Sequence, residues 1–135
     1  MVKTRDIILI LILIILDQLS KFYFKDKNFF IFNYTKNTGA AFSILQDYTL
    51  FLILISILVI SFTLYYFIKL KKINKSLRIA FILILSGTLG NLIDRVFLDY
   101  VRDFIDLKIW PIFNLADSYN VIGFILVVIY FYKKK

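Results

Sequence analysis

Two short segments of this chain each place a carboxylate beside an apolar stretch: Val-Arg-Asp-Phe at 101–104 and Phe-Asn-Leu-Ala-Asp-Ser at 113–118. The sequence contains no His, no Cys and no Glu. It therefore offers no thiol nucleophile, no imidazole base and no His or Cys ligand for zinc. If the chain breaks covalent bonds, its composition favours a pair of aspartates as the reacting groups.

The composition is that of a membrane protein. The 135 residues are 61% hydrophobic, more apolar surface than a soluble domain of this length could bury. We predict a single domain, residues 1–135, with four membrane spans at about 7–24, 48–68, 77–96 and 117–132. The first is interpreted as a retained span rather than a cleaved signal peptide, because no small-residue cleavage site follows it.

The distribution of charge predicts the orientation of these spans. Basic residues gather before the first span, between the second and third, and at the end of the chain, whereas the other two connections mix basic residues with Asp. The positive-inside rule then places both termini in the cytoplasm and the connections 25–47 and 97–111 outside. We interpret the basic clusters as membrane flanks and not as a nucleic-acid surface.

The first outer connection is rich in residues that favour strands. Residues 28–34 are mostly aromatic or apolar, and residues 40–45 follow an Asn-Thr-Gly turn. We expect these two segments to form a small sheet on the outer face of the membrane.

Three aspartates are predicted to share one depth in the membrane. Counted from the cytoplasmic edge, Asp17, Asp94 and Asp117 lie about 20, 24 and 23 Å into their spans. Asp103 lies in the last outer connection and could fold back onto this layer. A carboxylate near the centre of a span costs about 2.5–3.5 kcal/mol, so such residues are candidates for function.

Each of these polar residues also has a purely structural interpretation. Asp17 and Lys21 are four residues apart and could form an ion pair within one helix. Asn114 could cap a helix whose first turn contains Asp117. The remaining candidates could form a structural network at the end of the third span: Asn91, Asp94 and Arg95. Asp103 could be an ordinary loop acid.

Five motifs in order resemble the lipoprotein signal peptidases (signal peptidase II). They are Asp-Gln-Leu-Ser-Lys at 17–21, Asn-Thr-Gly-Ala-Ala-Phe at 37–42, Gly-Asn-Leu-Ile-Asp-Arg at 90–95, Val-Arg-Asp-Phe at 101–104 and Asn-Leu-Ala-Asp-Ser at 114–118. The resemblance implies a bundle of four transmembrane helices with a small extracytoplasmic β-cradle. It also implies a bacterial enzyme of the cytoplasmic membrane, with its active site on the extracytoplasmic side.

The resemblance further implies an aspartyl endopeptidase that cuts prolipoproteins before a diacylglyceryl-modified cysteine. Asp103 and Asp117 would form the catalytic dyad, with no cofactor and no metal. The partners would be lipid-modified prolipoproteins and membrane lipid, with no nucleic acid, and the enzyme would be a monomer. The residues expected to bind substrate or brace the site are Asp17, Lys21, Asn37, Gly39, Asn91, Asp94, Arg95 and Asn114.

Two other classes of protein also place acids in a membrane. A small proton- or cation-coupled transporter would do so, but transporter sites lie near the midplane between repeats, and this sequence has no internal repeat. A structural assembly subunit would leave the shared depth of the acids without a purpose.

Overall fold

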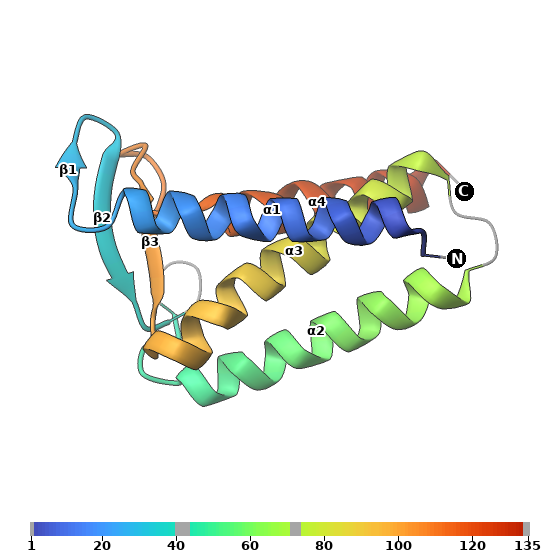
Figure 1. Cartoon of the computed structure of the whole chain (residues 1–135), viewed down its shortest axis with the longest axis horizontal. Coiled ribbons are helices and arrows are strands. Elements are labelled where there is room, and N and C mark those ends of the chain that lie inside the picture. Colours follow the sequence, from blue (N-terminus) through green and yellow to red (C-terminus); the bar gives the residue numbers. More distant parts are fainter. Residues whose placement is uncertain (1, 40–43, 71–73, 134–135) are drawn as a thin grey trace.

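The computed structural model describes residues 2–39, 44–70 and 74–133. The helices lie side by side, with both chain ends at one end of the molecule and a small sheet at the other (Figure 1). The helices are α1 (Thr4–Tyr23), α2 (Thr49–Lys69), α3 (Lys75–Leu98) and α4 (Leu115–Tyr132), and the strands are β1 (Asn28–Phe29), β2 (Phe32–Asn37) and β3 (Val101–Ile105).

Three of the described helices, α2, α3 and α4, are long and apolar enough to cross a membrane. The first helix, α1, has 20 residues, but it carries Arg5, Asp6, Asp17 and Lys21. The charges of the last three are buried inside the protein. The prediction of four transmembrane helices therefore stays a prediction for α1.

Helix α3 is the centre of the bundle. It contacts α1, α2 and α4, and its apolar side chains form a buried cluster with one residue of α2. The cluster consists of Phe67, Leu77, Phe81, Ile82 and Leu85. Most large apolar side chains of α2 and α4 point outward and are exposed, as expected for a surface that faces lipid.

Glycines allow α3 and α4 to approach closely. A Cβ at Gly87 would lie 2.3 Å from the carbonyl oxygen of Ala116, and a Cβ at Gly123 would lie 3.0 Å from that of Ala80. Small residues at such contacts are typical of packed membrane helices.

The sheet differs from the prediction in its third strand. Its order is β1-β2-β3 with antiparallel pairing, and Thr35 lies opposite Asp103. The prediction of strand structure within 28–34 is confirmed in part by β1 and β2. Of the predicted segment 40–45, residues 40–43 lie outside the described residues, and Ile44 and Leu45 form a turn. Leu45 has a left-handed backbone with φ 57°, which a strand does not allow.

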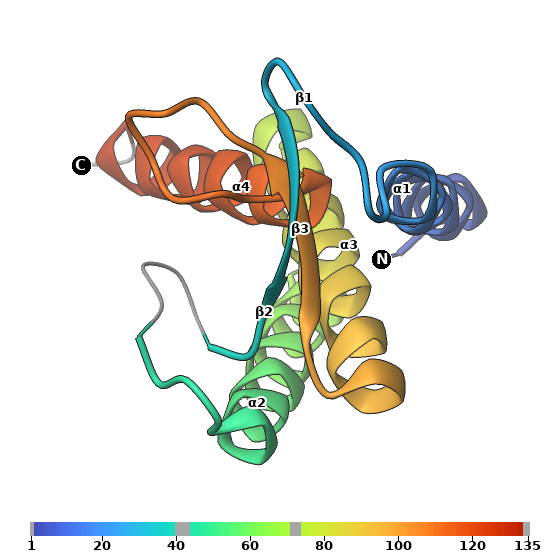
Figure 2. The same ribbon diagram turned by 90° about the vertical axis from the view of Figure 1, so that its left-hand side faces the viewer.

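An aromatic stack joins the sheet to the first helix. The Phe24 ring, just after α1, lies 4.2 Å from the Phe32 ring and 4.8 Å from the Phe104 ring, measured between centroids. Because Phe32 belongs to β2 and Phe104 to β3, the stack joins both strands to the end of α1. The sheet lies across the end of the bundle (Figure 2).

Candidate active site

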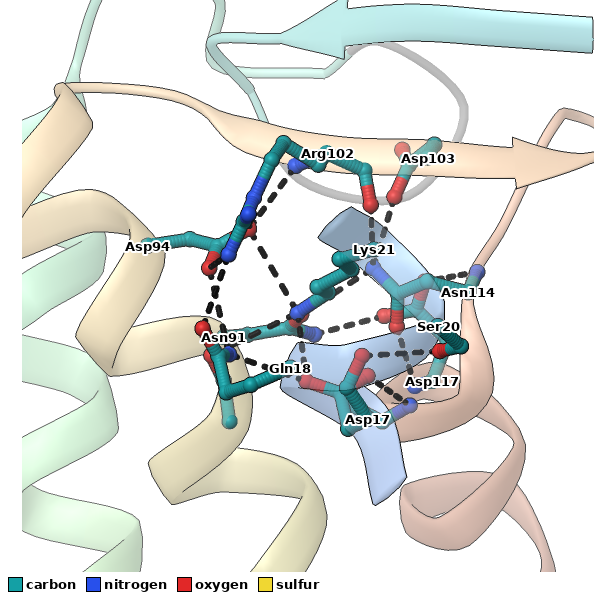
Figure 3. Close-up of polar contacts among 12 residues, drawn as sticks. Asp17, Gln18, Ser20, Lys21, Asn91, Asp94, Arg102, Asp103, Asn114 and Asp117 are labelled. Atoms are coloured by element: carbon teal, nitrogen blue, oxygen red, sulfur yellow. Dashed lines mark hydrogen bonds and ion pairs between the residues drawn. The ribbon is translucent and has the colours of Figure 1, made fainter. Parts of the chain in front are cut away.

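The polar residues that the sequence singled out meet beneath the sheet. They come from α1, α3, β3 and the start of α4 (Figure 3). Asp17, Lys21, Asp94, Asp103 and Asn114 are each at most 1% exposed.

Asp103 lies in the middle of β3 and is 1% exposed. Its Oδ2 accepts a hydrogen bond from Asn37 Nδ2 at 2.9 Å, and its Oδ1 accepts one from Asn114 Nδ2 at 2.7 Å. Burial, and then the nearby charge of Asp117, raise the pKa of Asp103 to about 7. This carboxyl group can therefore hold a proton near neutral pH.

Asp117 lies in the first turn of α4 and forms a capping box with Asn114. Its Oδ2 accepts a bond from the Asn114 backbone N–H at 3.0 Å, and its Oδ1 accepts one from Asn91 Nδ2 at 2.7 Å. It also lines a pocket of about 350 Å³ with apolar neighbours from the preceding loop and from α4. The other lining residues are Leu107, Trp110, Phe113, Ser118, Val121 and Ile122.

Asn114 connects the two carboxylates. Its side chain donates to Asp103, its backbone N–H donates to Asp117, and its Oδ1 accepts from the Asp117 backbone N–H at 2.9 Å. The prediction that Asn114 caps the last helix is confirmed, and the same cap fixes Asp117 relative to Asp103.

A second cluster of charges lies next to this pair. The buried Lys21 Nζ lies 2.8 Å from Asp17 Oδ2 and 3.5 Å from Asp94 Oδ2, and it donates to Asn91 Oδ1 at 3.0 Å. The predicted ion pair of Asp17 with Lys21 is thus present. Because Asn91 also donates to Asp117, this cluster supports the Asp117 side chain.

The principal cationic partner of Asp94 is Arg102 and not Arg95. The Arg102 guanidinium binds both oxygens of Asp94, with Nη2–Oδ1 at 2.8 Å and Nε–Oδ2 at 3.1 Å. Arg95 instead donates from Nη2 to the Gly39 carbonyl oxygen at 3.1 Å. The expected contact of Arg95 with Asp94 or Asp17 is therefore wrong, and Arg95 binds the loop after β2 instead. This bond also places Gly39 beside the site.

Two residues of the network were missed as site residues in the sequence. Arg102 Nη2 also donates to Gln18 Oε1 at 2.7 Å, and Gln18 Nε2 donates to Asp94 Oδ1 at 3.2 Å. A charge count indicates that Asp17 and Asp94 need a second cation besides Lys21, but it does not distinguish Arg102 from Arg95. Gln18 had no signal apart from its place beside Asp17.

The chemistry that this arrangement allows is general acid–base catalysis. Asp103 is buried, Asp117 is half-buried beside a pocket, and Asn114 connects them. The two carboxyl groups cannot both ionise without a large cost, so the pair favours sharing one proton. Among the described residues, no group of three or more acids could hold a metal ion. Fold and site together define a helical membrane protein with two aspartates beneath a small sheet.

Comparisons with known proteins agree with that class. The family model described as Signal peptidase (SPase) II matches residues 9–133. The lipoprotein signal peptidase of Clostridium novyi is 40% identical, covering 93% of this chain and 95% of its own length. That of Streptococcus pyogenes serotype M5 is 43% identical, covering 98% and 97%. The chain therefore belongs to the signal peptidase II family.

Solved structures share the fold as well. A bacterial membrane enzyme determined by the in meso method at 2.3 Å resolution is 34% identical, with a TM-score of 0.87 over 96% of this chain and 88% of that one. A second, at 1.9 Å, is 33% identical, with a TM-score of 0.84 over 97% and 94%. The family is that of proteases that remove signal peptides from prolipoproteins.

Proposed function

We propose that this chain is an aspartyl endopeptidase that cuts diacylglyceryl-modified prolipoproteins before the lipidated cysteine, with Asp103 and Asp117 as its dyad. The observation that carries the proposal is the double contact of Asn114, which holds one carboxylate by its side chain and the other by its backbone N–H. The pKa of about 7 at Asp103 supports a pair that carries one proton near neutral pH.

In the proposed reaction, the ionised aspartate takes a proton from a water molecule as the water oxygen attacks the scissile carbonyl carbon. The protonated aspartate donates its proton to the carbonyl oxygen, which gives a neutral tetrahedral diol. The C–N bond then breaks, with one aspartate accepting a proton from the diol and the other donating one to the leaving amine. Both carboxyl groups end with one shared proton, as they began.

The surroundings of Asp117 support a substrate that arrives from lipid. The pocket beside it is mostly apolar and lies against α4, where Val121 and Ile122 are 56% and 49% exposed. An apolar signal peptide could enter from the bilayer while the diacylglyceryl chains of the lipidated cysteine stay there. We place the site on the extracytoplasmic side of the cytoplasmic membrane, as the charge distribution predicts, and infer a chain that acts as a monomer.

The test is incubation of the purified protein with a diacylglyceryl-modified prolipoprotein, read as a mobility shift on a gel. We expect a shortened product whose new N-terminus is the lipidated cysteine, identified by mass spectrometry. A parallel assay in proteoliposomes measures proton and cation leakage. Leakage without cleavage would replace the proposed peptidase with the transporter alternative.

A further inference from the structure

The end of the sheet that lies beyond α1 and α4 carries a group of exposed apolar side chains, which we call the sheet tip. It consists of Phe29 and Phe30 at the β1–β2 turn and Leu107, Ile109 and Trp110 in the loop after β3. Phe30 is 87% exposed and Ile109 is 90% exposed. Phe30 and Ile109 therefore contribute little to the packed interior, whereas the Phe29 ring packs against Phe32 at 5.4 Å between centroids.

The backbone of Phe30 is in a conformation that disfavours phenylalanine. Its φ is 53°, in the left-handed region, where Gly or Asn is the usual residue of a short hairpin turn. A bulky residue that is strained and almost fully exposed gains little from folding. Its side chain is therefore available for a contact outside the protein.

The two parts of the sheet tip form one unit. The Asp106 backbone N–H donates to the Ile31 carbonyl oxygen at 2.8 Å, and Asn33 Nδ2 donates to Asp106 Oδ2 at 3.0 Å. The β1–β2 turn and the loop after β3 are thus joined directly. We therefore treat the turn and the loop as one unit of the surface.

The position of the sheet tip indicates what it contacts. The strands run across the helix axes, and the β1–β2 turn projects past α1 and α4 (Figures 1 and 2). The β1–β2 turn therefore lies beside the outer surfaces of α1 and α4. These surfaces are apolar and exposed: the side chain of Phe22 in α1 is 72% exposed and that of Val121 in α4 is 56% exposed. In a membrane, the space beside these surfaces is filled by lipid.

We propose that the sheet tip inserts into the outer leaflet of the surrounding bilayer and anchors the sheet to it. Aromatic residues favour this interfacial zone. The anchored loop continues into Asn114, and Trp110 lines the pocket beside Asp117. The insertion therefore fixes the site at the depth where a lipid-anchored substrate presents its cleavage point. The inference rests on the proposed membrane orientation, but not on the dyad.

Trp110 is the only tryptophan of the chain and serves as the probe. The full-length protein is reconstituted in phosphatidylcholine–phosphatidylglycerol vesicles, with bromine atoms placed high on the acyl chains. We expect brominated lipid to quench Trp110 emission at least twofold, and aqueous acrylamide to quench it weakly. Strong quenching by acrylamide with none by brominated lipid would overturn the proposal, whether or not the protein cleaves substrate.

Substitutions separate insertion from folding. Phe30→Asn should leave the melting temperature in detergent unchanged or higher, because Asn tolerates the left-handed backbone, and should reduce lipid quenching of Trp110 about twofold. It should also raise KM for lipidated substrate in vesicles several-fold, with kcat retained. Phe97→Asn is the matched control, since Phe97 is 78% exposed but lies at the end of α3. Equal quenching in Phe30→Asn and wild type would contradict the insertion.

Discussion

Neutral amides, and not cations, make the closest contacts to the two candidate catalytic carboxylates. Asp103 is bound by Asn37 and Asn114, and Asp117 by Asn91 and Asn114. Among the described residues, neither carboxylate forms an ion pair within 4.0 Å, whereas Asp17 and Asp94 do. Amide donors orient a carboxylate without adding a positive charge. The pair can therefore keep a proton, while the neighbouring acids act as anchors for cations.

The raised pKa of Asp103 predicts how stability depends on pH. The folded protein holds this proton up to about pH 7, whereas an unfolded chain loses it near 3.8. The folded state therefore binds more protons between these values, and its stability falls as pH rises through them. Asp103→Asn removes this dependence. We expect the melting temperature of the wild type, relative to Asp103→Asn, to drop by several degrees from pH 4.5 to 7.5.

A constant difference between the two melting curves over that range would show that Asp103 has an ordinary pKa in the folded protein. The proposed sharing of one proton also predicts that cleavage declines above about pH 7, since the proton donor is lost.

Arg102 is expected to position Asp103, its neighbour in β3. Its guanidinium binds both oxygens of Asp94 and reaches Gln18, so it ties the strand to α3 and α1. Arg102→Lys loses the planar two-point contact but keeps the charge. We predict that kcat falls about tenfold in Arg102→Met and less in Arg102→Lys, with KM little changed. A purely structural residue would lower the melting temperature and leave kcat per folded molecule intact.

The sequence predicted the members of the site better than their partners. The ten residues predicted to form or brace the site all lie in or beside the network, including Asp103, which was expected in a connection and lies in β3. The pairing of Arg102 with Asp94 was not predicted, because Arg95 is adjacent in sequence and equally basic. Which of two neighbouring arginines turns toward a carboxylate depends on how the chain turns between Leu98 and Val101, and the helical pattern of α3 carries no information on that turn.

At the scale of the elements, two helices begin with an asparagine cap of the same kind. Asn114 Oδ1 accepts from the N–H of Asp117, and Asn74 Oδ1 accepts from the N–H of Leu77. Only the Asn114 cap belongs to the site, because Asn74 starts α3 at the opposite end of the bundle. The two caps therefore form a natural comparison.

We predict that Asn74→Ala and Asn114→Ala each destabilise the protein by about 1 kcal/mol through the lost cap. Asn74→Ala should keep wild-type cleavage, whereas Asn114→Ala should reduce kcat at least a hundredfold, since Asp103 and Asp117 lose their shared partner. Thermal unfolding in detergent and the gel assay measure the two effects. Similar activities of the two variants would contradict the connecting role of Asn114.

Helices were easier to predict than strands in this chain. All four observed helices begin and end within about three residues of the predicted spans. The strand β3 was missed, because residues 101–105 contain two charges and follow a helix closely. Its residues become a strand only by pairing with β2, which lies more than sixty residues earlier, and such pairing leaves little local pattern.

At the scale of the whole molecule, the chain ends and the sheet lie at opposite ends of the bundle (Figure 1). This separation agrees with the charge distribution, which predicts cytoplasmic termini and an external sheet. The sequence has no cysteine, so single cysteines can be introduced without background. Lys27 lies between α1 and the sheet, and Lys75 begins α3 at the other end.

We predict that, in intact cells, an impermeant thiol reagent labels Lys27→Cys and leaves Lys75→Cys unlabelled until the cells are opened. Cleavage activity of both variants serves as the control for folding. Labelling of Lys75→Cys alone would invert the protein and place Asp103 and Asp117 on the cytoplasmic side.

The most direct test of the central claim is the cleavage of a diacylglyceryl-modified prolipoprotein by Asp103→Asn and Asp117→Asn. Asparagine keeps the size of each side chain and removes only its ability to exchange a proton. Both variants should melt within a few degrees of the wild type or above it, and each should lose at least a thousandfold in kcat. Turnover near the wild-type rate in either folded variant would contradict the assignment of these two aspartates as the dyad.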